Sequence, residues 1–107
     1  MPQYVVKLNH PPDQCPLANS KVRERVVKFG SEQAQLAQEM GVKFLAGPFM
    51  LPAEHESIAV VEADRVEAVQ NFILRSGLAQ WNTVRVSPAV PMAELLKDMD
   101  KNPPPLY

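Results

Sequence analysis

Apolar residues follow two different spacings along this chain, and the order of these spacings restricts the fold more than any other feature. A spacing of two residues predicts a half-buried strand, and a spacing near 3.6 residues predicts an amphipathic helix. The two patterns alternate in the order βαββαβ. The predicted strands cover residues 4–10, 42–50, 57–62 and 81–87, and the predicted helices cover residues 20–40 and 65–76.

Local signals mark the ends of these segments. Gly41 and Gly77 follow the two helical patterns, where a glycine commonly closes a helix. Asp64 stands where a side chain can cap the start of the second helix. Pro52 lies within residues 51–56, which predict a turn that joins the second and third strands into a hairpin. A length of 107 residues suits one compact domain with a single core.

The crossovers of both helices are expected to be right-handed, which makes a ferredoxin-like arrangement the favoured packing. In that α+β fold, a four-stranded antiparallel sheet carries the first strand between the third and the fourth. The end of the first strand, the hairpin and the start of the fourth strand then meet at one end of the sheet. We therefore expect four residues of these segments to be neighbours, namely His10, Cys15, His55 and Trp81.

The chain has two histidines and one cysteine, and the expected fold gathers all three at this end of the sheet. Imidazole and thiolate groups are soft to borderline ligands that suit zinc, copper or nickel. His10, Cys15 and His55 therefore predict a transition-metal site. Glu54 and Glu56 flank His55, and either carboxylate is a candidate for the fourth ligand.

Other interpretations of these three residues stay open. A single cysteine is often a small buried hydrophobic residue, and single histidines in loops are usually solvated. Strict alternation would place His10 and His55 on opposite faces of the sheet, unless the strand ends bend. If Pro16 begins a helix, in contrast, Cys15 is its N-cap residue, where the helix dipole favours the metal-binding thiolate.

Several segments carry a recognisable pattern. Residues 45–49 read LAGPF, residues 58–64 read IAVVEAD, and residues 5–11 read VVKLNHP. These segments resemble the YCII-like branch of the dimeric α/β-barrel superfamily, in which a glycine–proline strand precedes a VEAD strand and a helix. Residues 10–16 (HPPDQCP) and 80–84 (QWNTV) are similar instead to an uncharacterised bacterial family of small barrels.

The resemblance implies a homodimer, in which two four-stranded sheets face each other and enclose a cavity. The YCII pattern pairs a histidine with an aspartate; His10 matches the histidine, and no acidic residue within 20–40 matches the aspartate. Members of the wider superfamily isomerise, dehalogenate or monooxygenate small compounds, and some bind nickel. The resemblance thus implies either a YCII-like or related enzyme, or a protein that sequesters metal.

Polar residues on the predicted strands suggest an alternative site in the dimer cavity. Lys7 and Arg85 would attract a carboxylate, Asn9 would donate a hydrogen bond, and Trp81 would stack on an aromatic ring. These residues would bind a small aromatic or carboxylated ligand. In the competing interpretation, Lys7 and Arg85 form ion pairs with acidic residues across the sheet.

Charge and motif content narrow the function classes. Eleven basic and 12 acidic residues give a formal net charge of −1, which offers no electrostatic footprint for a nucleic acid. No leader pattern and no apolar run near the roughly 18 residues of a spanning helix are evident, so we expect a cytoplasmic protein without a membrane partner. No glycine-rich phosphate loop occurs, and neither a nucleotide nor a flavin is indicated.

The C-terminal residues depart from the pattern of the barrel domain expected over residues 1–90. Residues 91–107 begin with Pro91, which suits the start of a short helix over about residues 92–99. Residues 103–107 read PPPLY and predict an extended polyproline II segment. This tail would either dock into an aromatic groove of a partner or lie along its own dimer.

Overall fold

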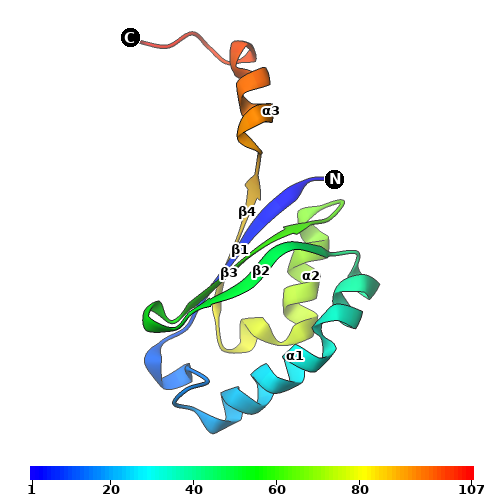
Figure 1. Cartoon of the computed structure of the whole chain (residues 1–107), viewed down its shortest axis with the longest axis vertical. Coiled ribbons are helices and arrows are strands. Elements are labelled where there is room, and N and C mark those ends of the chain that lie inside the picture. Colours follow the sequence, from blue (N-terminus) through cyan, green and yellow to red (C-terminus); the bar gives the residue numbers. More distant parts are fainter.

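The computed structural model describes residues 1–107 and has the α+β order that the sequence predicts. Figure 1 shows two long helices packed beside a sheet, and a third helix that stands away from the body. The strands are β1 (Gln3–Asn9), β2 (Lys43–Leu51), β3 (Glu56–Glu62) and β4 (Thr83–Ala89). The α-helices are α1 (Ser20–Met40), α2 (Val66–Ser76) and α3 (Met92–Lys97).

The four strands form one antiparallel sheet in the order β2-β3-β1-β4. β1 therefore lies between β3 and β4, and the strand order predicted for a ferredoxin-like fold is confirmed. Val6 of β1 lies opposite Ala59 of β3 and Val86 of β4. Because side chains alternate along each strand, this register gathers the apolar positions on one face of the sheet.

The apolar face of the sheet packs against α1 and α2. Val61 of β3 and Val69 of α2 are each only 1% exposed. The ring of Phe72 on α2 meets Phe29 of α1 and Phe44 of β2 edge to face, with centroids 6.2 Å and 5.8 Å away. Both long helices therefore cover the same face, and the other face has no cover within one chain.

Most helix ends follow the predicted signals. The α1 helix spans the predicted residues, with the Asn19 side chain accepting hydrogen bonds of 3.0 Å and 3.1 Å from two backbone N–H groups of its first turn. Gly41 closes the same helix in the left-handed conformation, at φ 72°. The prediction that Asp64 caps α2 is wrong, because the N-cap position is Arg65 and no side chain bonds there.

The hairpin of β2 and β3 is present, and the middle of β2 is irregular. The register with β3 shifts between Phe44 and Phe49. Gly47 lies in this stretch with φ 83°, and a Cβ atom placed on it would lie 2.8 Å from the carbonyl oxygen of Ile58. Both the positive φ and the close approach of β3 exclude a side chain, so this bulge requires glycine.

The face without helices carries a mixture of apolar and charged side chains. Phe49 lies opposite Ile58 and is 58% exposed, and Val5 lies opposite Val60. The exposed Lys7 shares this face, because it alternates with the buried Val6 and half-buried Leu8 of the core side.

The C-terminal arm consists of α3 and the residues after it, and it projects from the end of β4 (Figure 1). The α3 helix ends at Lys97, two residues before the predicted end, and a short 3-10 turn follows over Met99–Lys101. The arm presents several exposed apolar side chains, namely Met92, Leu95, Leu96 and Met99. None of the helices combines the length and the apolar content that crossing a bilayer would need.

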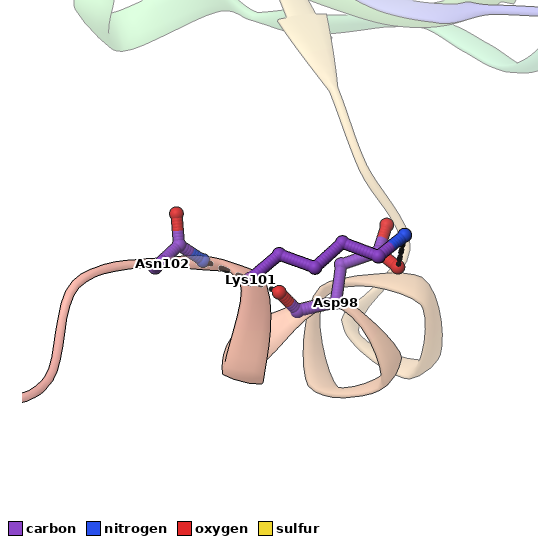
Figure 2. A network of polar contacts seen from close by, with 3 residues as sticks. All are labelled: Asp98, Lys101 and Asn102. Carbon is purple, nitrogen blue, oxygen red and sulfur yellow. Dashed lines mark hydrogen bonds and ion pairs between the residues drawn. The ribbon is translucent and has the colours of Figure 1, made fainter.

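A small polar network follows α3 in the arm (Figure 2). The Nζ of Lys101 lies 3.0 Å from Oδ1 of Asp98, and Nδ2 of Asn102 donates to the carbonyl oxygen of Asp98 at 3.4 Å. Both charged side chains are mostly exposed. Exposed pairs of this kind contribute little to stability, so the network shapes the turn after α3 without anchoring the arm to the body.

Candidate metal centre

Three segments meet at the end of the sheet where β1 ends. His10 follows β1, Cys15 lies in the connection to α1, and His55 lies in the turn between β2 and β3. One ring nitrogen of each histidine and the sulfur of Cys15 all lie within 4.8 Å of one another. The predicted convergence is confirmed, and the group is geometrically able to hold a metal ion.

The β2–β3 turn brings His55 to this group through a rare backbone conformation. His55 has φ 54° and ψ 41°, a left-handed conformation that residues other than glycine seldom adopt. Its carbonyl oxygen accepts hydrogen bonds from the N–H of His10 at 3.1 Å and from Nδ2 of Asn9 at 3.3 Å. These bonds fasten the turn to the end of β1.

The same conformation explains why His10 and His55 do not lie on opposite faces of the sheet, as strict alternation would require. Alternation of faces holds only for extended residues, and His55 is not extended. The imidazole rings of His10 and His55 therefore meet edge to face, with centroids 5.5 Å apart and planes inclined by 71°.

Asn82 sets the tautomer of His10. Its Nδ2 donates to the carbonyl oxygen of Leu78 at 3.0 Å, so its Oδ1 is the atom that faces Nδ1 of His10, at 3.2 Å. An amide oxygen only accepts hydrogen bonds, so Nδ1 of His10 carries the proton and Nε2 keeps its lone pair. Metal-binding histidines usually have such an acceptor on the second nitrogen, which fixes the ring and raises the basicity of the ligating nitrogen.

Two ring nitrogens of this group are buried without a hydrogen-bond partner. They are Nε2 of His10 and Nδ1 of His55. The only other buried side-chain nitrogen or oxygen atom without a partner is Oε1 of Gln33. A buried polar atom without a partner costs about 1–3 kcal/mol. Two such atoms on neighbouring rings are therefore unfavourable, and a metal ion bound by them would use both lone pairs.

The backbone holds Cys15 in place. The residue is 5% exposed and its thiol is free. Its N–H donates to the carbonyl oxygen of Pro12 at 3.2 Å, which closes a short 3-10 turn. The hypothesis that Cys15 caps a helix beginning at Pro16 is wrong, because α1 begins only at Ser20 and Asn19 occupies the N-cap position.

The distances between the three donors reach slightly beyond those around a bound tetrahedral metal ion. Bonds of about 2.0 Å to nitrogen and about 2.3 Å to sulfur place the ligands of a tetrahedral ion about 3.3–3.6 Å apart. The three donors lie within 4.8 Å of one another, so side-chain rotations that bring them about 1 Å closer would complete such a site.

Neither Glu54, which is exposed, nor Glu56, which is half-buried, belongs to the group. An ion held by the three donors alone would keep a fourth position for water or for a ligand.

The four residues of the alternative ligand site lie on two sides of the sheet. Lys7 lies opposite Arg85, and Asn9 shares their uncovered face. The one ion pair of the chain lies in the C-terminal arm, so neither Lys7 nor Arg85 is paired with an acidic residue. Trp81 lies on the core side, where its ring centroid is 5.3 Å from that of His10. Trp81 therefore packs against the His10 ring of the candidate metal centre.

Asn82 is the residue of this centre to which the sequence assigns no role. It is 72 positions from His10, and an asparagine before a strand forms no pattern with a distant histidine. Its place beside Trp81, in the segment that leads to the same end of the sheet, is the only signal in the sequence.

No similarity to known proteins bears on the roles of these residues. Comparison with protein-family models, with curated proteins and with solved structures gave no match to this chain.

Proposed function

We propose that this protein binds a transition-metal ion through Nε2 of His10, the thiolate of Cys15 and Nδ1 of His55. One observation carries the proposal: each histidine has a buried ring nitrogen without a partner, and one ring nitrogen of each histidine and the sulfur of the buried Cys15 lie within 4.8 Å of one another. Metal ions bind the neutral imidazole and the deprotonated thiol. The tautomer that Asn82 imposes on His10 leaves the required lone pair free.

The ligand set favours zinc, with nickel and copper as the other candidates. Two imidazoles and one thiolate form a borderline set that zinc accepts in tetrahedral geometry. Structural zinc sites are closed by four protein ligands, whereas catalytic sites have three and keep one open position. The three donors of this group therefore support an ion that remains accessible to a small molecule.

The proposal includes a homodimer of the dimeric α/β-barrel type, formed through the uncovered faces of two sheets. Phe49 is 58% exposed on that face and lies opposite the apolar Ile58. A second copy would remove this surface from water, and the exposed apolar side chains of the C-terminal arm would add to the contact. The resemblance of residues 45–49 and 58–64 to the YCII-like branch supports the same assembly.

Elemental mass spectrometry of tag-free protein tests the metal site. Wild-type protein should carry near-stoichiometric metal, and His10→Ala, Cys15→Ala and His55→Ala should each lose most of it, because two remaining ligands bind weakly. Glu54→Gln is the matched control, since it changes an exposed residue next to His55 that lies outside the donor group.

Two results would contradict the proposal. One is a Cys15→Ala variant that retains the metal content of the wild type. The other is a wild-type protein that is metal-free as purified and also fails to take up zinc, copper or nickel.

A further inference from the structure

A cavity of about 100 Å³ lies between the sheet and the two long helices. Fifteen of the 21 residues that line it are hydrophobic, and they come from the sheet and from both helices. Its apolar walls include Val6, Phe29, Ala59, Val61, Val69 and Phe72. A chamber with such walls has few groups that could hold water, and apolar cavities of this kind stay dry and accept apolar guests.

The chamber reaches the metal centre. His10 itself lines it, together with Trp81 and Asn82, which contact the His10 ring. Pro16, the neighbour of Cys15, and Glu56, the neighbour of His55, line it as well. Each of the three donor residues, or a residue bonded to it, is thus part of the chamber wall.

We propose that the open position of the metal faces this chamber, and that the site takes short ligands with a metal-binding head and an apolar tail. The proposal rests on the metal site proposed above. A cavity of about 150 Å³ accepts benzene or xenon, so about 100 Å³ holds xenon or a tail of roughly four non-hydrogen atoms. Apolar walls with a few polar groups at one end are the usual composition of a small-molecule site.

Xenon tests the chamber in the absence of metal. Methyl NMR spectra of the metal-free full chain under xenon should show shifts at Val6, Val61 and Val69, which line the chamber. Val27 is 69% exposed and serves as the internal control, with no comparable shift expected. Shifts spread evenly over all valines, or no shifts, would overturn the chamber as a binding site.

A pair of thiols tests the link between chamber and metal. Methanethiol and 1-propanethiol have the same metal-binding head, and the second adds two methylene groups. Their affinities for cobalt-loaded protein are measured from the cobalt absorption bands. Burial of two methylene groups should make propanethiol bind roughly 15-fold more tightly. Equal affinities in the wild type would overturn the proposal.

Filling the chamber should abolish this preference. Ala59 is buried and lines the chamber, and Ala59→Ile adds a β-branched side chain that suits its strand. The affinity ratio of the two thiols should fall toward one in this variant. The same change at the exposed Ala34 of α1 is the control and should keep the wild-type ratio. A full preference in Ala59→Ile would show that the tail lies elsewhere.

These measurements separate the two proposals. Failure of cobalt to bind would refute the metal site and the metal-facing role of the chamber, while the xenon shifts would still decide whether the chamber binds apolar guests. Cobalt binding without a thiol preference would leave the metal site standing and refute only the metal-facing role of the chamber.

Discussion

Replacing Asn82 with alanine should weaken metal binding although Asn82 is not a proposed ligand. The Oδ1 of this residue lies 3.2 Å from Nδ1 of His10, and its Nδ2 donates to the carbonyl oxygen of Leu78 at 3.0 Å. Without the acceptor, the His10 ring loses the bond that fixes its tautomer and its angle. The Nε2 atom is then free to carry the proton, and the neutral ring must change tautomer before it binds metal.

The expected loss of metal affinity follows from the hydrogen bond between Asn82 and His10. Loss of a hydrogen-bond partner behind a metal-ligating histidine typically costs 10–100-fold in metal affinity, which is about 1.4–2.7 kcal/mol. Asn82→Asp keeps an acceptor for Nδ1 of His10 and loses only the donor to Leu78. Because carboxylates also orient metal-binding histidines, zinc affinity in Asn82→Asp should equal or exceed that of the wild type.

Competition with a chromophoric zinc chelator measures these affinities. Far-UV circular dichroism of each variant checks that the fold is retained. Asn71→Ala, at an exposed position of α2, is the matched control and should bind zinc as the wild type does. Wild-type affinity in Asn82→Ala would refute the orienting role. Equal losses in the Ala and Asp variants would show that the side chain acts only through the local fold near Leu78.

Further predictions concern stability and assembly. Zinc at 100 times its dissociation constant should add about 2.7 kcal/mol to the free energy of unfolding, measured as a rise in Tm, and Cys15→Ala should abolish most of this rise. Gly47→Ala should lower the free energy of unfolding by about 1–3 kcal/mol in urea titrations, because its Cβ would lie 2.8 Å from a β3 carbonyl oxygen at φ 83°. Gly30→Ala, in open space within α1, should instead stabilise by up to about 1 kcal/mol, and a matching loss at both glycines would contradict the close-approach argument. Phe49→Glu should convert the proposed dimer to a monomer in light-scattering measurements, and an unchanged mass would exclude this face as the interface.

The strands and long helices were predictable because their signals are local. The apolar stripe of α1 and the glycine at position 41 define the helix without reference to the rest of the chain. The start of β4 was less predictable. It begins at Thr83 and not at Trp81, because a 3-10 turn over Leu78–Gln80 precedes it and the N–H of Asn82 donates to Leu78 at 3.1 Å.

The uncovered face of the sheet was predictable only in part. Alternation in β1 and β4 correctly places Lys7 and Arg85 on one face. It also placed Trp81 with them, whereas the structure packs that ring against His10 on the core side. The reason is that Trp81 precedes the strand, where alternation does not apply.

The sequence by itself determined which donors are available and that they meet at one end of the sheet. Two right-handed crossovers and one hairpin favour the ferredoxin-like packing, in which the end of the first strand and the hairpin meet at one end of the sheet. The tertiary structure alone decided the chemistry of these donors. The lone pair on Nε2 of His10 depends on the Asn82 side chain, 72 residues away. The position of His55 depends on its own left-handed backbone, whose carbonyl oxygen accepts a hydrogen bond from the N–H of His10. Such features arise from hydrogen bonds between distant segments, which local spacing does not encode.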